Sequence, residues 1–265
     1  MTLSPPPLEA RDLSAGYGAA AVLRDVSLLV AEGRMTVLAG PNGSGKSTLL
    51  AALARLIRPQ AGAVLLDGAQ IARLPTRDVA RRLGLLPQNP LTPEGLSVRD
   101  LVARGRYPHQ GLLRQWSLQD ERAVAEALRI TGTEDFASRP VESLSGGQRQ
   151  RVWIAMALAQ DTGILLLDEP TTYLDLHYQV EVMQLLARLV RDHGRTVVAV
   201  LHDLNFALQF ADRIAFLKDG RLCRVIEEPG ACDAALVREV FATEVVALRH
   251  PQTGLPVFVP ADGRA

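Results

Sequence analysis

The chain has 265 residues, of which 48% are hydrophobic and 22% charged, and its formal net charge is +0. These proportions are typical of globular proteins, and they exclude a disordered chain, a collagen-like repeat and a disulfide scaffold. The length suits one substantial α/β domain. Because positive and negative charges balance, no overall field attracts nucleic acid, and we expect no nucleic-acid partner.

The compartment is indicated by what the chain does not contain. No apolar run approaches the roughly 20 residues that a membrane-spanning helix needs. Nothing resembling a signal peptide opens the chain, and Cys223 and Cys232 form no metal- or redox-type pair. We therefore expect a protein of the reducing cytoplasm that can still dock on a membrane protein.

The first part of the chain favours strands. Residues 1–7 are rich in proline, and we expect no regular structure there. Short apolar segments at 22–30, 35–39 and 64–66 predict strands separated by turns that contain Gly or Asp. A beginning of this kind indicates a small antiparallel sheet beside a core sheet.

From Val98 the apolar residues recur at helical spacings, and residues 89–160 are interpreted as a helical insertion. Strands and helices then alternate, which predicts a parallel sheet covered by helices on both faces. The segments expected after the insertion are a strand at 164–167, a helix at 176–192, a strand at 196–201, a helix at 204–211, and strands near Ile214 and Leu222. Residues 245–265 carry only a weak strand pattern interrupted by prolines.

The segment from Gly40 to Thr48 matches the phosphate-loop pattern G-x-x-x-x-G-K-[ST], after a predicted strand and before a helical pattern that starts at Leu49. Its glycines let backbone N–H groups surround phosphate oxygens, and the helix N-terminus adds its dipole. Lys46 is suited to the β and γ phosphates, and the Ser47 hydroxyl to Mg²⁺. Lys46 is one of two lysines in the chain, with Lys218, which fits a loop that admits a compact ammonium and not a planar guanidinium.

Two carboxylates end the predicted strand at 164–167. Consecutive residues at a strand end point in different directions, so Asp168 and Glu169 need not duplicate each other. We assign Asp168 to the Mg²⁺ of a nucleotide and Glu169 to the attacking water as general base. Together with the phosphate loop, this predicts a P-loop nucleotide hydrolase that uses Mg²⁺.

The segment Leu144-Ser145-Gly146-Gly147-Gln148 precedes an apolar helical pattern and forms a second anion-receptive helix start. It resembles the signature motif of the ATP-binding-cassette (ABC) superfamily. In that family two cassettes dimerise head to tail, and each ATP lies between one phosphate loop and the signature of the second copy. The resemblance therefore implies a homodimer.

The other family motifs occur in order, and the resemblance assigns their residues. Tyr17 matches the aromatic residue that stacks on adenine. Gln88 matches the glutamine that contacts Mg²⁺ or water, and His202 matches the switch histidine that senses the γ-phosphate. Asp175 matches the aspartate of the dimer-contacting loop, where Thr172 replaces the commoner serine and keeps a hydroxyl.

The expected site falls into three groups. The catalytic residues are Glu169, His202 and Gln88. The metal ligands are Ser47, Gln88 and Asp168. The nucleotide-contacting residues are Tyr17, Gly40, Pro41, Asn42, Gly43, Ser44, Gly45, Lys46, Ser47, Thr48, Ser145, Gly146, Gly147, Gln148 and Asp175.

Several functions use such a cassette. No sustained heptads separate the phosphate loop from the signature, which argues against chromosome and repair ATPases. Residues 104–109, 170–175 and 201–205 look like the importers of ferric siderophores, haem and cobalamin, and residues 241–260 are similar to the siderophore branch. Haem or cobalamin import, and a soluble ABC ATPase such as one for iron–sulfur cluster assembly, remain alternatives.

The resemblance implies an α/β P-loop NTPase fold of the ABC ATPase type. It has a mixed core sheet flanked by helices, an antiparallel β subdomain and an inserted α-helical subdomain. The expected ATP-binding domain covers residues 8–243, with the helical subdomain at about 89–160, and residues 244–265 form a short tail. The implied partners are membrane permease subunits, a second copy of the chain and, indirectly, a substrate-binding protein. The expected location is peripheral, at the cytoplasmic face of the cell membrane.

Overall fold

The computed structural model describes residues 6–18, 20–90, 94–111 and 116–261. Predictions that concern residues 1–5, 91–93, 112–115 and 262–265 lie outside the described residues. The chain forms two compact units. The first joins Met1–Arg73 to Thr196–Ala265, and the second is Leu74–Arg195.

The first unit contains strands of a mixed sheet. In the order β10, β9, β3, β8 these strands are Arg221–Ile226, Arg213–Lys218, Met35–Ala39 and Thr196–Val200. Strand β3 pairs in parallel with both of its neighbours, and β9 pairs with β10 in antiparallel fashion. Every residue of β3 and β8 is buried, as expected for parallel strands covered on both faces. The prediction of strands at 35–39 and 196–201 is therefore confirmed, with the second ending one residue earlier.

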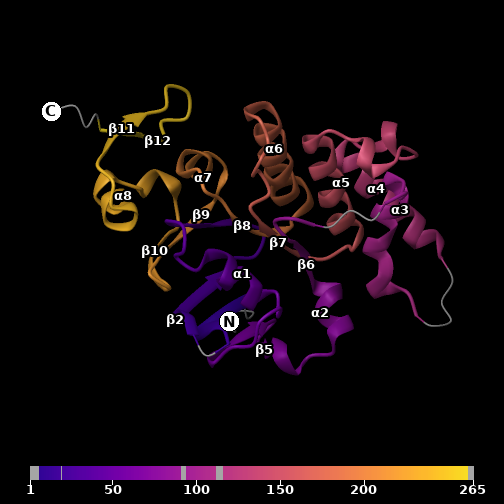
Figure 1. The fold of residues 1–265 in the computed structure, drawn as a ribbon, viewed down its shortest axis with the longest axis horizontal. Helices are drawn as coiled ribbons and strands as arrows, with labels where there is room; N and C mark the ends of the chain where they lie inside the picture. Colours follow the sequence, from indigo (N-terminus) through magenta and orange to yellow (C-terminus); the bar gives the residue numbers. More distant parts are fainter. Residues whose placement is uncertain (1–5, 19, 91–93, 112–115, 262–265) are drawn as a thin grey trace, which may run out of the picture. The chain divides into compact units, whose positions relative to one another are not determined.

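The same unit contains the predicted antiparallel sheet. In the order β2, β1, β4, β5 its strands are Ala20–Val30, Leu8–Tyr17, Ala61–Leu66 and Ala69–Gln70. Helix α1 (Lys46–Leu53) contacts β1 and β2 of this sheet and β8 of the mixed sheet, so it lies between the two sheets (Figure 1). Its shared position explains why Leu49, Leu50 and Leu53 are all buried.

The C-terminal residues form a hairpin that docks on the first unit. Strands β11 (Val245–Arg249) and β12 (Pro256–Pro260) pair in antiparallel register next to α7 (Leu204–Phe210) and α8 (Ala234–Phe241) (Figure 1). The amide of Asn205 donates to the Phe258 carbonyl at 3.1 Å and accepts from the Phe258 N–H at 2.9 Å. Asn205 thus pairs with Phe258 as a neighbouring strand would, and this contact orders a tail that the sequence pattern left undefined.

The second unit contains two parallel strands, β6 (Leu83–Leu86) and β7 (Ile164–Asp168), in the register Leu86↔Leu167. Its α-helices are α2 Thr76–Arg82, α3 Val98–Ala103, α4 Leu118–Thr131, α5 Gly146–Ala159 and α6 Leu176–His193. Helices α3, α4 and α5 pack on one another, and apolar residues of α3 and α4 such as Val98 and Val124 are fully buried. Among the described residues, no helix has the length and apolar composition needed to cross a membrane.

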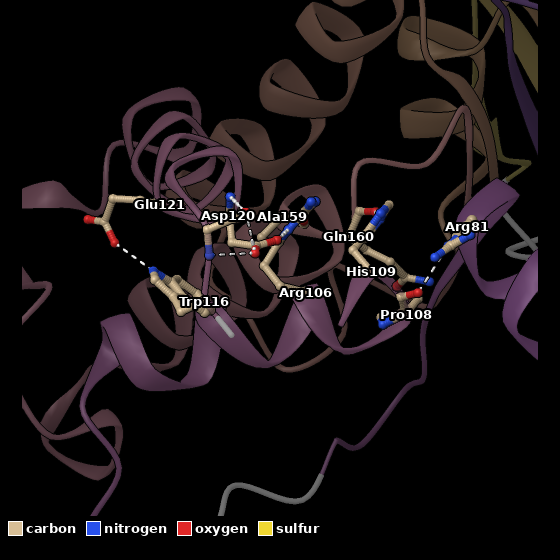
Figure 2. A network of polar contacts seen from close by, with 10 residues as sticks. Arg81, Arg106, Pro108, His109, Trp116, Asp120, Glu121, Ala159 and Gln160 are labelled. Atoms are coloured by element: carbon tan, nitrogen blue, oxygen red, sulfur yellow. Dashed lines mark hydrogen bonds and ion pairs between the residues drawn. The ribbon is translucent and has the colours of Figure 1, made fainter. Parts of the chain in front are cut away.

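A buried ion pair holds this helical cluster together (Figure 2). Arg106 follows α3 in a 3-10 turn, donates to Asp120 at 2.9 Å and to the Ala159 carbonyl at 2.7 Å, and is only 1% exposed. Burial by itself raises the pKa of Asp120, but hydrogen bonds from Ser117 and Arg106 outweigh burial and lower the pKa to about 2. The pair therefore links the turn, the N-terminus of α4 and the C-terminus of α5.

The same 3-10 turn is held from a second side (Figure 2). The Pro108 carbonyl accepts from the guanidinium of Arg81 at 3.0 Å, and the His109 ring lies 2.8 Å from the Gln160 carbonyl oxygen. Residues 104–109, whose sequence resembles that of the siderophore, haem and cobalamin importers, are thus held mainly by structural contacts within this unit. Tyr107, 64% exposed, is a member that points to solvent.

Removing one partner of the Arg106–Asp120 pair leaves a buried charge without its counter-ion. We expect Arg106→Ala to reduce the free energy of unfolding by about 3–5 kcal/mol at pH 7. The lowered pKa of Asp120 means that its ionised carboxylate stabilises the fold above pH 3.8, and that this contribution is lost as the pH falls toward 2. The difference in unfolding free energy between wild type and Arg106→Ala should therefore become smaller below about pH 4. Urea unfolding of wild type and Arg106→Ala, at pH 7 and below about pH 4, measures this difference.

The matched control is Arg129→Ala, which breaks an exposed pair with Glu126 on α4. This change should reduce the free energy of unfolding far less than Arg106→Ala does, because water screens an exposed pair. Equal losses for the two variants would show that the Arg106 pair does not depend on its burial.

Candidate active site

In the first unit, two loops leave adjacent parallel strands at the same edge. Leu38 of β3 pairs with Val200 of β8, so the loop that starts at Gly40 and the segment that carries His202 both follow the carboxyl ends of these strands. Ligands of open α/β sheets bind at this edge. The sheet register therefore puts the predicted phosphate loop and the predicted switch histidine on one side of the unit.

The Gly40–Thr48 loop has the backbone conformation that phosphate binding requires. Gly40, Gly43 and Gly45 have φ values of 144°, 78° and 100°, a region that other residues rarely adopt. A Cβ on Gly40 would lie 2.0 Å from the Leu217 carbonyl oxygen, so a larger residue does not fit there. The helix begins at Lys46, three residues before the predicted start, because the loop leads directly into α1.

Lys46 and Ser44 are polar residues buried inside this loop. The Lys46 ammonium donates to the carbonyls of Gly40 and Pro41 at 2.9 Å each, which fixes it at the centre of the loop. Ser44 is 2% exposed, and its hydroxyl has no hydrogen-bond partner among the residues that the structure describes. A buried hydroxyl without a partner costs free energy, and an oxygen of a bound phosphate would satisfy it.

Tyr17 and His202 lie in the first unit at positions open to solvent. Tyr17 ends β1, pairs with Ala20, and is 61% exposed, so its ring is available for stacking. His202 is exposed and follows buried Leu201. Asp203, the next residue, caps α7 by accepting from the Phe206 N–H at 3.0 Å, and this fixes the chain direction immediately after His202.

In the second unit, Gln88 and Glu169 follow the adjacent strands β6 and β7, and their side chains meet. The Gln88 amide donates to Oε2 of Glu169 at 2.5 Å, and the Thr172 hydroxyl donates to the same oxygen at 3.0 Å. Asp168 is half-buried at the end of β7. The structure thus brings together Gln88 and Glu169, two residues predicted to be catalytic. It also places the Thr172 hydroxyl on the same carboxylate.

The signature segment forms a capping box at the start of α5. Ser145 accepts from the Gln148 N–H at 3.3 Å, while the Gln148 side chain accepts from the Ser145 N–H at 3.1 Å. Asp175 caps α6 in a related way, accepting from the Tyr178 N–H at 3.1 Å. These residues, expected to contact nucleotide or a second subunit, therefore also start two helices.

Gly147 lies against the first turn of α6. A Cβ there would be 2.3 Å from Cγ of the Tyr178 ring, whereas a Cβ on Gly146 would meet Leu174 at an ordinary 3.6 Å. The close approach joins the signature helix to the helix that Asp175 caps. Sequence reasoning missed Tyr178, because no spacing in the sequence shows which ring lies under a glycine.

Other local features did leave a signal in the sequence. The Ser145–Gln148 and Ser117–Asp120 capping boxes both match the pattern of a hydroxyl residue followed three positions later by an acid or amide. That pattern identifies helix starts from sequence. The bond from Thr172 to Glu169 left a weaker signal, namely a hydroxyl three residues after the carboxylate.

Comparisons with known proteins agree with this geometry. The sequence pattern described as "ABC transporter" matches residues 23–172. The probable siderophore transport system ATP-binding protein YusV of Bacillus subtilis (strain 168) is 51% identical over 250 residues, which cover 94% of this chain and 90% of the relative. The chain belongs to the ABC transporter family.

Solved structures show the same fold. An inward-facing putative metal-chelate type ABC transporter matches with a TM-score of 0.83 and 28% identity, covering 96% of this chain and 97% of that one. The dimeric structure of MJ0796, a bacterial ABC transporter cassette, matches with a TM-score of 0.72 and 33% identity, covering 83% of this chain and 98% of that one. The predicted fold of an ABC ATPase cassette is therefore confirmed.

Because Gly147 lies against Tyr178, alanine should destabilise the protein more at position 147 than at the neighbouring position 146. Gly147→Ala should reduce the free energy of unfolding by about 1–3 kcal/mol, because the ring or the helices must shift. Gly146→Ala, the control in the same turn, should change it by less than about 1 kcal/mol. Urea unfolding measures both, and equal effects would contradict the steric role of Tyr178.

Proposed function

We propose that this chain is the ATP-hydrolysing subunit that powers import of an iron(III)-siderophore through a membrane permease. The observation that carries the proposal is the 51% identity, over 94% of the chain, to a protein described as a probable siderophore transport ATP-binding protein. The active-site geometry supports the ATPase part independently of that relative.

The phosphate loop fits ATP. Its glycines adopt positive φ, Lys46 is held at its centre, and the Ser44 hydroxyl is buried with no hydrogen-bond partner in the described part of the chain. The loop thus offers a cation, a hydroxyl and backbone N–H donors to phosphate oxygens. Tyr17, exposed at the end of β1, is suited to stack on the adenine.

Mg²⁺ prefers hard oxygen donors. We assign Ser47, Gln88 and Asp168 as the residues that would hold the ion, since a hydroxyl, an amide oxygen and a carboxylate are ligands that Mg²⁺ accepts. When bound, Mg²⁺ would neutralise charge on the transferring phosphoryl group.

Hydrolysis needs a base for water and a sensor for the γ-phosphate. Glu169 is the proposed base, and Gln88, hydrogen-bonded to its carboxylate, helps to orient it. His202, exposed directly after the buried end of β8, is the proposed contact to the γ-phosphate. These three residues receive the catalytic roles, and the phosphate loop binds and orients the substrate.

A second copy of the chain completes each site in this proposal. The segment Ser145–Gln148 begins α5 with an anion-receptive N-terminus, although the chain already has one phosphate loop. A related cassette is known as a dimer. We propose that the signature and Asp175 of each copy contact the ATP held by the other, and that closure of the dimer drives the permease.

The assembly follows from these roles. The chain associates peripherally with permease subunits at the cytoplasmic face of the membrane, and a substrate-binding protein delivers the chelate to them. The relative favours the siderophore branch over haem, cobalamin or iron–sulfur assembly.

Substitution of the base should separate binding from hydrolysis. In Glu169→Gln, ATP binding should persist while hydrolysis falls by about a hundredfold or more, since no carboxylate accepts the proton. The variant should accumulate as an ATP-dependent dimer in size-exclusion chromatography. Lys46→Ala, the control for binding, should lose ATP affinity, and normal turnover by Glu169→Gln would refute the base assignment.

Uptake of radioiron tests the transport proposal. Iron-starved cells that lack the chain should fail to take up a ferric siderophore, supplied as hydroxamate and catecholate types in parallel. Wild-type chain should restore uptake, and Glu169→Gln should not, because the permease then lacks hydrolysis. The decisive strain also lacks the other siderophore importers. If it still takes up both types of siderophore normally, the siderophore assignment is wrong, while the ATPase assignment is unaffected.

A further inference from the structure

We propose that Thr172 is a positioning residue for hydrolysis, which fixes the orientation of the Glu169 carboxylate and connects it to the signature helix of the same chain. This inference rests on the proposed role of Glu169 as the base. The sequence motifs place Thr172 in the dimer-contacting loop in the position of a serine, but they assign it no role in hydrolysis.

Two donors from different parts of the second unit meet on one oxygen of Glu169. The Thr172 hydroxyl donates at 3.0 Å and the Gln88 amide at 2.5 Å, both to Oε2. Two bonds to the same oxygen restrict rotation of the carboxylate, and they thereby set the direction in which Oε1 points. Geometry of this kind is what a general base requires before water arrives.

The backbone strengthens the contact between Thr172 and Glu169. Glu169 has a φ of 52°, in the left-handed region that non-glycine residues enter at a cost. The Thr172 N–H donates to the Glu169 carbonyl at 3.2 Å, so Thr172 binds Glu169 through both its backbone and its side chain. The turn from Glu169 to Thr172 is therefore closed twice, which helps the unusual backbone conformation to persist.

The choice of threonine has a physical reason. A β-branched side chain has few χ1 rotamers, so its hydroxyl is directed before any bond forms. Thr172 is also half-buried, which limits competition from water. Serine at this position would keep the donor but lose part of the orientation.

The same loop leads to the signature helix. Three residues after Thr172, Asp175 caps α6, and Tyr178 in the first turn of α6 lies directly under Gly147. A displacement of the signature helix start can therefore reach the turn that holds Glu169 through contacts within one chain. In the proposed dimer this couples the signature, which serves one ATP, to the base, which serves the other.

The test compares Thr172→Val, which keeps the shape and removes the donor, with Thr172→Ser, which keeps the donor. We expect kcat for ATP to fall about tenfold in Thr172→Val, with the Kd for ATP within about twofold of wild type. Thr172→Ser should restore kcat to within about threefold. Thr172→Ala provides a second variant without the hydroxyl if valine disturbs folding.

Hydrogen–deuterium exchange of the nucleotide-free protein gives a readout that does not depend on catalysis. Amides of residues 169–175 should exchange faster in Thr172→Val than in wild type, whereas Thr172→Ser should match wild type. Unchanged kcat in the valine variant, or equal losses in the valine and serine variants, would overturn the positioning role.

Failure of this inference is distinguishable from failure of the proposed function. If Glu169→Gln hydrolyses ATP normally, the base assignment fails and the catalytic part of the inference fails with it. If Glu169→Gln is inactive but Thr172→Val is fully active, the proposed function stands and only the role of Thr172 is wrong. If Glu169→Gln and Thr172→Val both lose activity while Thr172→Ser keeps it, the base assignment and the positioning role of Thr172 are both supported.

Discussion

The site depends on one constraint: the carboxyl ends of neighbouring parallel strands lie at the same edge of a sheet. In the first unit the pairing of β3 with β8 brings the phosphate loop and the segment of His202 to one edge. In the second, the pairing of β6 with β7 brings Gln88 to Glu169. A shift of register in either pair would separate residues that the proposed mechanism requires together.

Several residues proposed for ATP chemistry also stabilise the local fold. Gly45 allows the entry into α1, and Asp203, directly after His202, caps α7. Ser145 and Gln148 cap α5, and Asp175 caps α6. Since a helix N-terminus has free N–H donors and a positive dipole, a residue that caps it already lies where an anion would bind. A substitution at such a position changes stability and chemistry together, so a conservative control variant is needed to separate them.

The segment 104–109 makes mainly structural contacts within the second unit. Arg106 is buried against Asp120, and His109 lies against the Gln160 carbonyl (Figure 2). Both orient the turn that joins α3 to the rest of the helical cluster. Tyr107, exposed from that turn, is held in a defined position by these neighbours.

The sequence alone was sufficient where a local pattern and its chemistry coincide. The phosphate loop, the buried strand that ends at Asp168 and the helix at 176–193 follow from spacing, glycines and apolar periodicity, which act between near neighbours in the chain. Strand β6, helix α2 and helix α8 were not predicted, because segments of four to eight residues are too short to show a distinct apolar period. Contacts between distant residues were decided only by tertiary structure: Gln88 with Glu169, Arg106 with Asp120, Gly147 with Tyr178, and Asn205 with Phe258. Their partners are brought together by sheet register and helix packing, which no local pattern encodes.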